Sequence, residues 1–291
     1  MKPAIFDYHQ AKDFDHACEL LSACGEDSKI LAGGQSLIPM MNFRLARPKA
    51  LIDISNIADR NQVTEEAGGI RVRATTVQRF VEKSRAVQAR LPLLHDAIRH
   101  IAHLQIRNKG TIGGSIVNAD PASELPAMCL ALDAELEIKS QSGQRTIPAE
   151  EFFVTYMTTS LLPDEILTSI LFSEPPKNSG WGFHEVARRS GDYALAGSAA
   201  VIALDAAGKC THARLALFSV AATPVRAKHA EELLIGQVYS AELLKEAAQK
   251  IQDVVDPEGD VHVTADYRRS VAEVLTVRAL EDAFRRANVV R

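Results

Sequence analysis

Ile30-Leu31-Ala32-Gly33-Gly34-Gln35-Ser36-Leu37 is one of two double-glycine segments in this sequence. The other is Thr111-Ile112-Gly113-Gly114-Ser115-Ile116-Val117-Asn118-Ala119-Asp120-Pro121. In each segment an apolar stretch leads into two glycines, then a small polar or amide residue, then apolar residues again. Because glycine has no Cβ, its backbone can approach a ligand closely. Several N–H groups aimed at one point can hold phosphate oxygens. We therefore predict that both segments are ligand-binding loops.

Secondary structure alternates around the first glycine pair. Apolar residues at helical spacing predict a helix over His16–Cys24, with Asp13 or Asp15 as its N-cap. Short apolar or alternating runs predict strands at Ser28–Ala32, Ala50–Ile54 and Gly69–Ala74. The first of these strands leads directly into the glycines.

Helices are predicted before the second glycine pair and strands after it. Thr76 is expected to cap a helix that begins at Val77. Pro92 suits the first turn of a helix over Leu93–Ala102, because the N–H that proline lacks would be unpaired there. Further strands are predicted at Leu136–Ile138 and Ile166–Leu171.

The cluster Glu174-Pro175-Pro176-Lys177-Asn178-Ser179-Gly180 marks the best domain boundary, since prolines restrict their own and neighbouring backbone. After this boundary we predict a hairpin-like turn at Asp205–Lys209. Near the C-terminus we predict a core-facing helical stripe made of Tyr267, Val271, Val274 and Leu275. The predicted strands are Trp181–Ala187, Ala196–Leu204 and Ala213–Val220, and the predicted helices are Arg226–Ile235, Ala241–Val254 and Tyr267–Arg286. We predict an α+β protein with domains at 1–176 (lobes of about 1–57 and 58–176) and 177–291.

Composition is that of an ordinary globular protein. Of 291 residues, 46% are hydrophobic and 24% charged, with a net charge of −4, so no basic excess indicates a nucleic-acid partner. No apolar run approaches the length of a membrane span, and the N-terminal residues lack the apolar core of a signal peptide, so we expect a cytoplasmic protein. Cys18, Cys24, Cys129 and Cys210 form no C-x-x-C pair, which favours buried free thiols over a metal or iron–sulfur site.

The common nucleotide motifs are absent. No G-x-G-x-x-G opens a helix and no G-x-x-x-x-G-K-[ST] occurs, which argues against a doubly wound NAD-type domain and against P-loop nucleotidases. Gly34-Gln35-Ser36-Leu37-Ile38 lacks the closing glycine of a hydrolase nucleophile elbow. Taken alone, each glycine pair is more often a tight turn than a ligand site.

Five segments together resemble the FAD-binding medium subunits of molybdenum hydroxylases, the carbon monoxide dehydrogenase and xanthine dehydrogenase family. The segments are Ala32–Arg44 with Asp53 at the end of the next strand, Gln105–Glu124, Gly191–Gly197, Ala222–Arg226 and Ala265–Ser270. The resemblance covers nearly the whole chain in the right order.

This resemblance implies a two-lobed FAD-binding domain of the vanillyl-alcohol oxidase and p-cresol methylhydroxylase type, followed by a small α+β domain in which an antiparallel sheet packs with helices. FAD would be bound in this chain. The implied partners are a small iron–sulfur subunit and a large subunit with a molybdenum–pterin cofactor, in a heterotrimer that dimerises. Electrons would pass from the clusters through FAD to an external acceptor.

The resemblance also implies roles for residues. Leu31–Leu37, comprising Leu31, Ala32, Gly33, Gly34, Gln35, Ser36 and Leu37, would wrap the pyrophosphate, and Thr111 would offer its hydroxyl to the phosphates. Backbone at Gly113, Gly114 and Ser115 would lie near the ribityl chain and ring, with Asn118 close by. Glu124 would accept hydrogen bonds from cofactor hydroxyls, Ile101 and Leu167 would pack on flat cofactor surfaces, and Tyr193 would govern access to the ring.

Several of these roles have structural alternatives. Ile101 and Leu167 would serve equally well as core residues, and Tyr193 as a buried tyrosine bonded to a loop carbonyl. Relatives often carry a lysine in the strand that here reads Phe183-His184-Glu185-Val186. His184 is the candidate to replace that charge near the flavin.

An alternative function is a free-standing FAD-dependent reductase or oxidase of the same fold, such as the enolpyruvyl sugar reductases. It is the weaker hypothesis because no convincing substrate acid stands outside the flavin segments. In the family that this chain resembles, the substrate is set in another chain, so carbon monoxide, purines, other heterocycles and aldehydes all stay open. NAD, quinone, a cytochrome and oxygen stay open as the acceptor.

Overall fold

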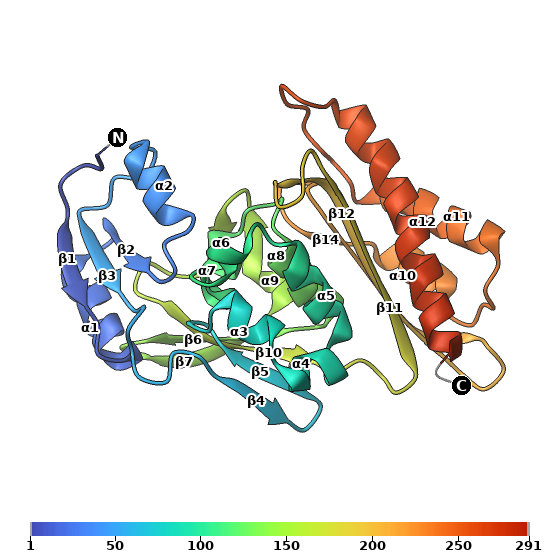
Figure 1. The fold of residues 1–291 in the computed structure, drawn as a ribbon, viewed down its shortest axis with the longest axis horizontal. Coiled ribbons are helices and arrows are strands. Elements are labelled where there is room, and N and C mark those ends of the chain that lie inside the picture. Colours follow the sequence, from blue (N-terminus) through green and yellow to red (C-terminus); the bar gives the residue numbers. More distant parts are fainter. Residues whose placement is uncertain (1, 290–291) are drawn as a thin grey trace.

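The computed structural model describes residues 2–289, and its first part is a small parallel sheet. The strand order is β1-β3-β2, with both outer strands parallel to the central β3 (Figure 1). The elements are β1 (Asp7–Gln10), α1 (Phe14–Cys24), β2 (Ser28–Leu31), α2 (Leu37–Asn42) and β3 (Ala50–Asp53). Asp13 caps α1 as predicted, because its carboxylate accepts from the His16 N–H at 2.8 Å.

The second lobe is an antiparallel sheet with a layer of short helices over it (Figure 1). Its strand order is β4-β5-β10-β6-β7, so the late strand β10 lies in the centre. The strands are β4 (Val63–Glu66), β5 (Gly69–Arg73), β6 (Glu135–Ser140), β7 (Gly143–Pro148) and β10 (Ile166–Ser173), with a short pair β8 (Phe153–Thr155) and β9 (Thr158–Thr159). The helices are α3 (Gln78–Glu82), α4 (Arg85–Arg90), α5 (Pro92–His100), α6 (Leu104–Arg107), α7 (Ile112–Asn118), α8 (Glu124–Ala131) and α9 (Ala149–Phe152).

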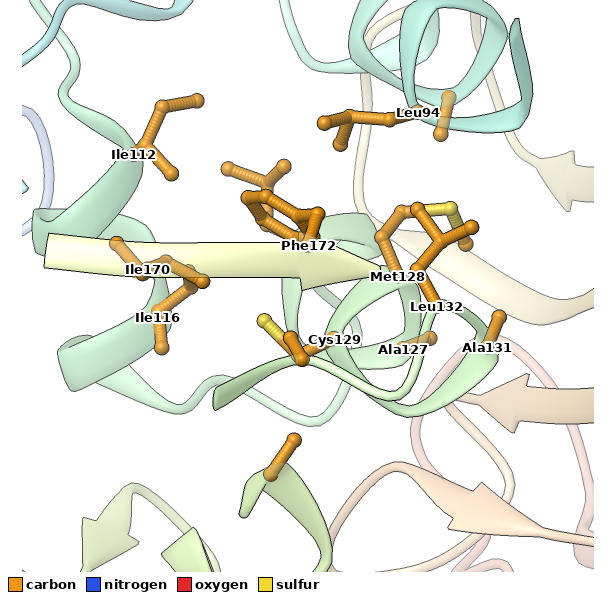
Figure 2. Packing of buried hydrophobic residues seen from close by; sticks show 14 of the residues in the cluster. Leu94, Ile112, Ile116, Ala127, Met128, Cys129, Ala131, Leu132, Ile170 and Phe172 are labelled. Carbon is orange, nitrogen blue, oxygen red and sulfur yellow. The ribbon is translucent and has the colours of Figure 1, made fainter. Parts of the chain in front are cut away.

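The core of this lobe lies between β10 and helices α5, α7 and α8. Figure 2 shows Ile170 and Phe172 of β10 among Leu94, Ile116 and Met128 from the three helices. Every residue of α8 is buried, which explains its nearly uniform apolar sequence. The lobe therefore holds α7 and α8 rigidly, and these two helices carry much of the second glycine segment.

The C-terminal part is a four-stranded antiparallel sheet in the order β11-β12-β13-β14, covered by helices. All residues of β12 are buried, because α5 and α8 pack on one face of the sheet and α12 on the other (Figure 1). The elements are β11 (Ser179–Ala187), β12 (Ala194–Leu204), β13 (Cys210–Phe218), β14 (Val225–Arg226), α10 (Lys228–Leu234), α11 (Ala241–Gln249), a 3₁₀ turn η1 (Lys250–Asp253) and α12 (Ala265–Val289).

The two faces of β11 have different partners. A Cβ at Gly182 would overlap the Ala279 carbonyl oxygen of α12, so glycine is required for the close approach of this helix. Phe183 points the other way and stacks on Phe218 with ring centroids 5.8 Å apart, in the core shared with the second lobe. Because side chains alternate along a strand, His184 lies on the α12 side and Glu185 on the second-lobe side.

These observations confirm the predicted α+β class and the small antiparallel domain at the C-terminus. Pro92 is the first residue of α5, as predicted, although that helix ends at His100. Cys18, Cys129 and Cys210 are buried free thiols, whereas Cys24 is half-buried. No helix within residues 2–289 combines the length and apolar character needed to cross a bilayer.

Three local predictions are wrong. Thr76 caps no helix: its hydroxyl bonds to backbone of Gln62, and Val77 precedes α3 instead. Tyr267 and Val274 of the predicted stripe are 45% and 50% exposed. The side of α12 that faces the core is formed instead by its alanines and Phe284. The second glycine segment is not a loop, since most of it forms α7.

Candidate functional site

A cavity of about 590 Å³ lies where the first lobe, the second lobe and the β11–β12 loop meet. Its volume is in the range of small-molecule and cofactor sites. The predicted site residues that line it are Ala32, Gly33, Gly34, Gln35, Ser36, Leu37, Ile101, Thr111, Gly113, Gly114, Ser115, Asn118, Glu124, Leu167 and Tyr193. The structure therefore brings together residues that are far apart in the sequence.

The first glycine segment forms one wall as an irregular turn between β2 and α2. Gly34 has a φ of +69°, which glycine adopts without strain. Within the described chain, the backbone N–H groups of Gly33–Ser36 donate to no other protein group. The Gln35 side chain instead bonds back to the Gly33 carbonyl at 2.8 Å. This wall consequently offers a run of free N–H donors, the arrangement that binds anions.

Gly33 also lets two loops touch. A Cβ there would overlap the Lys109 carbonyl oxygen and lie 2.8 Å from Gly110 Cα. The segment that ends at Gly110 thus rests directly on the first glycine pair. Glycine at this position fixes the relative placement of the two lobes around the cavity.

The second glycine pair serves packing inside the protein. The Gly113 N–H donates to the Ala74 carbonyl at 2.8 Å, and a Cβ on Gly113 would lie 2.5 Å from Ala74 Cβ. The Gly114 N–H donates to the Thr111 hydroxyl oxygen at 3.0 Å, which makes Thr111 the N-cap of α7. These N–H groups are therefore not available to a ligand, although the Thr111 hydroxyl keeps its own proton to donate.

Polar and apolar side chains complete the walls. Ser115 shares a hydrogen bond of 2.9 Å with Ser123, a lining residue that sequence reasoning missed. Ile101 and Leu167 are 8% and 3% exposed and belong to the second-lobe core, so both line the cavity while also packing as core residues. Tyr193 is 68% exposed, which excludes the alternative of a buried structural tyrosine.

Gln78 is another lining residue that the sequence did not indicate. It is 4% exposed, and its side-chain oxygen has no hydrogen-bond partner in the described chain. Leaving a buried amide oxygen without a partner is costly, and this oxygen is almost fully covered by protein atoms near Gly110. No motif pointed to it, because Gln78 reaches the cavity only through the contact between α3 and Gly110.

Glu124 is the first residue of α8 and is 7% exposed. Burial, reinforced by the Glu185 carboxylate, raises the pKa of Glu124 to about 8. The side chain is thus mainly a neutral acid at pH 7 in the absence of a ligand, whereas sequence reasoning expected a carboxylate. A neutral acid can donate one hydrogen bond and still accept others.

The raised pKa of Glu124 gives a testable pH dependence. The folded chain holds this proton more tightly than the unfolded chain, where the pKa is near 4.5, so stability is lost as the pH rises from about 4.5 to about 8. In the FAD-free chain, Glu124→Gln should remove up to roughly 4 kcal/mol of this loss. Thermal unfolding midpoints of both proteins across this range measure it. Parallel curves would contradict the assignment.

Comparisons with known proteins identify the family of this chain. Residues 4–174 match the family described as the FAD binding domain in molybdopterin dehydrogenase. Residues 181–283 match the CO dehydrogenase flavoprotein C-terminal domain. The chain belongs to the FAD-binding subunits of molybdenum hydroxylases. This confirms the family that the glycine segments indicated.

Relatives of this FAD-binding subunit match along almost their entire length. It is 40% identical to the 6-hydroxypseudooxynicotine dehydrogenase complex subunit alpha of Paenarthrobacter nicotinovorans, over 99% of this chain and 97% of the relative. It is 38% identical to the carbon monoxide dehydrogenase medium chain of Hydrogenophaga pseudoflava, over 98% of this chain and 99% of that relative. A solved carbon monoxide dehydrogenase from that organism superposes with a TM-score of 0.96 at 38% identity, over 98% of this chain and 99% of that one.

The residues around the cavity fit FAD, the cofactor of this family. The free N–H groups of Gly33–Ser36 suit a pyrophosphate. Ile101 and Leu167 offer apolar surfaces to flat rings. When bound, FAD would supply the redox chemistry, while the protein supplies binding and orientation.

The structure does not bring His184 or Leu31 to the cavity. His184 lies on the α12 face of β11, where its Nε2 is 3.2 Å from Asp282 Oδ2. Strand alternation places Glu185 on the second-lobe side instead. Leu31 ends β2, and its side chain packs beside Gly34 rather than lining the cavity.

Proposed function

We propose that this chain is the FAD-carrying electron-transfer subunit of a cytoplasmic, heterotrimeric molybdenum hydroxylase. It would take electrons from the iron–sulfur clusters of a small subunit and pass them to an external acceptor, while a large subunit carries the molybdenum–pterin cofactor. The run of free N–H groups at Gly33–Ser36, on the wall of a cofactor-sized cavity, is the observation that carries this proposal.

The predicted residues that line the cavity with polar groups, and Tyr193, have distinct roles in this proposal. Gly33–Ser36 hold the pyrophosphate through backbone N–H groups, and Thr111 donates its remaining proton to a phosphate oxygen. Glu124 bonds to cofactor hydroxyls, and Ser115 and Asn118 provide further polar contacts. Tyr193, at the exposed edge of the cavity, limits access to the flavin ring.

The proposed partners are supported by relatives and by the surface of the first lobe. The names of relatives include a medium chain and a subunit of a complex. Around α2, Ile38, Phe43 and Leu45 are 44%, 67% and 77% exposed. Large apolar residues clustered at a surface are typical of an interaction site, and this one borders the segment that lines the cavity. We also propose that the chain divides after residue 176, which the two separate family matches support.

Isolation and co-expression test the proposal together. The chain alone should purify yellow with FAD and should neither oxidise nor reduce small metabolites at a useful rate. Co-expressed with the genes encoded beside it, it should elute as a larger complex whose flavin bleaches when substrate is added anaerobically. Leu45→Asp should weaken assembly, whereas Val261→Asp, at a residue that is 93% exposed elsewhere, should not.

Two outcomes would contradict the proposal. A folded chain that stays colourless when offered FAD would exclude the cofactor site. Rapid turnover of a metabolite by the chain alone would favour the free-standing reductase or oxidase.

A further inference from the structure

Ser219, directly after β13, has a backbone conformation that favours glycine. Its φ is +63°, in the left-handed region that is unfavourable for a residue with a Cβ. Such a conformation persists only where surrounding contacts hold it. Ser219 is 9% exposed, so its hydroxyl also needs hydrogen-bond partners inside the protein. The contacts of Ser219 therefore indicate why a serine stands where glycine would fit without strain.

The hydroxyl and the N–H of Ser219 each bond to a segment beside the cavity. The hydroxyl donates to the Ala194 carbonyl, one residue after Tyr193. The N–H donates to the Pro121 carbonyl at 2.7 Å, in the link between α7 and α8. That link continues into Ser123, which lines the cavity as Tyr193 does. Ser219 thus joins the segment at the cavity mouth to one of the cavity walls.

Arg268 of α12 strengthens this junction. Its Nη1 donates to the Ser219 hydroxyl oxygen at 3.0 Å, to the Ser219 carbonyl at 3.2 Å and to the Leu195 carbonyl at 2.7 Å. Its Nη2 donates to Asp260 at 2.7 Å, so the guanidinium is itself held in place. The Arg268 side chain is 11% exposed, and hydrogen bonds from a charged donor are stronger than those between neutral groups. Two side chains therefore fix the carbonyls of Ala194 and Leu195.

The chain is also supported on the other side of Tyr193. A Cβ at Gly191 would lie 3.0 Å from the Ala102 carbonyl carbon, so this glycine rests against the backbone that follows α5. The Asp192 N–H donates to the Arg189 carbonyl at 3.1 Å, which closes a turn. Only Asp192 and Tyr193 lie between the two supports. Contacts on both sides consequently set the place of Tyr193, although its own side chain is 68% exposed.

We propose that Ser219 and Arg268 are positioning residues that hold Tyr193 at the mouth of the FAD cavity. The Ser219 hydroxyl fixes the chain directly after Tyr193, and Arg268 fixes both the hydroxyl and the next carbonyl. The pair thereby keeps the phenol ring where it limits the approach of an electron acceptor. This inference rests on the proposed function, because that function assigns Tyr193 to the flavin ring.

Ser219→Gly tests the hydroxyl without disturbing the backbone, because glycine adopts a φ of +63° freely. Hydrogen exchange is measured in the full chain without FAD. Loss of the bond to Ala194 should speed the exchange of residues 188–195 by about fivefold. Residues 119–123 should exchange as in the wild type, since the Ser219 N–H still reaches Pro121. Unchanged exchange over residues 188–195 would overturn the proposal.

Asn178→Gly is the matched control. Asn178 has a φ of +64°, so glycine relieves the same backbone conformation, but this exposed residue does not line the cavity. Its exchange over residues 188–195 should equal that of the wild type. Arg268→Gln, which removes the charged donor to Leu195, should speed exchange at least as much as Ser219→Gly. Equally fast exchange in Asn178→Gly would contradict the proposal, because the lost hydroxyl would then not be the cause.

The fluorescence of bound FAD provides a readout that a purely structural role would not change. A tyrosine ring in contact with an excited flavin shortens its fluorescence lifetime by lending it an electron, which then returns. In the FAD-loaded chain, Tyr193→Phe should lose the shortest lifetime component. Ser219→Gly should reduce the amplitude of that component while FAD stays bound. Adding Ser219→Gly to Tyr193→Phe should have no further effect, since both changes act through one ring.

The outcomes separate this inference from the proposed function. A wild-type lifetime in Ser219→Gly or in Tyr193→Phe would overturn the positioning role. A chain that binds no FAD would refute the proposed function instead. The exchange experiment would then still decide whether Ser219 holds the segment that carries Tyr193.

Discussion

Gly33→Ala should release FAD from a chain that still folds. The added Cβ would overlap the Lys109 carbonyl oxygen and lie 2.8 Å from Gly110 Cα, and both are backbone atoms that cannot rotate away. The two loops must separate, which displaces the free N–H groups of Gly33–Ser36 on the cavity wall. Overpacking of this kind costs about 1–3 kcal/mol, so FAD affinity should fall on the order of 100-fold. Flavin fluorescence titration of the apoprotein measures the change.

The control for Gly33→Ala is Gly259→Ala. The nearest atom to a Cβ at Gly259 is the Ala265 nitrogen at 3.3 Å, and the position needs no positive φ. This variant should bind FAD as the wild type does. If Gly33→Ala bound FAD with unchanged affinity, the first glycine segment would not be the pyrophosphate site.

Arg226→Met should cause a large loss of folding stability. Arg226 is 13% exposed and donates two hydrogen bonds of 2.8 Å to Glu231, which is 7% exposed. The same guanidinium bonds to Asp133 and Glu150 of the second lobe, so it joins that lobe to the C-terminal helices. Removing it leaves Glu231 buried without its countercharge, a loss of about 3–5 kcal/mol. Urea unfolding of the chain should show a lower midpoint.

Two further variants separate charge from packing at this contact. Arg214→Met removes a more exposed pair with Asp133 and should cost no more than about 1 kcal/mol. Combining Arg226→Met with Glu231→Met replaces the buried pair by apolar side chains and should restore much of the midpoint. Equal losses in Arg214→Met and Arg226→Met would show that the buried carboxylate is not the cause.

Local patterns predicted most of the secondary structure and the residues of the cavity, for identifiable physical reasons. Asp13 and Pro92 act within one helical turn of their own positions, so their roles as N-cap and first residue follow from the sequence alone. The first glycine pair likewise exposes its own N–H groups. Such features need no knowledge of distant segments.

The errors arose where a distant segment decides the outcome. A side chain at position 113 would collide with Ala74, which lies far from Gly113 in the sequence. The second glycine pair was therefore predicted to be a ligand-binding loop, although it packs α7 against Ala74. Gln78 was missed because only the contact with Gly110 brings it to the cavity. His184 was assigned to the flavin because the sequence does not tell which face of β11 meets the second lobe. The Gly182 contact with α12 settles that point.

The alternation of β11 also limits how this strand can change over evolutionary time. Gly182 and His184 meet α12, while Phe183 and Glu185 meet the second lobe. Inserting a single residue upstream of them would exchange the two sets, driving an aromatic ring into the helix and a glycine into the shared core. Apart from Gly182, residues of this strand can therefore be replaced one at a time, whereas lengthening or shortening the strand by one residue would exchange the contacts of its two faces.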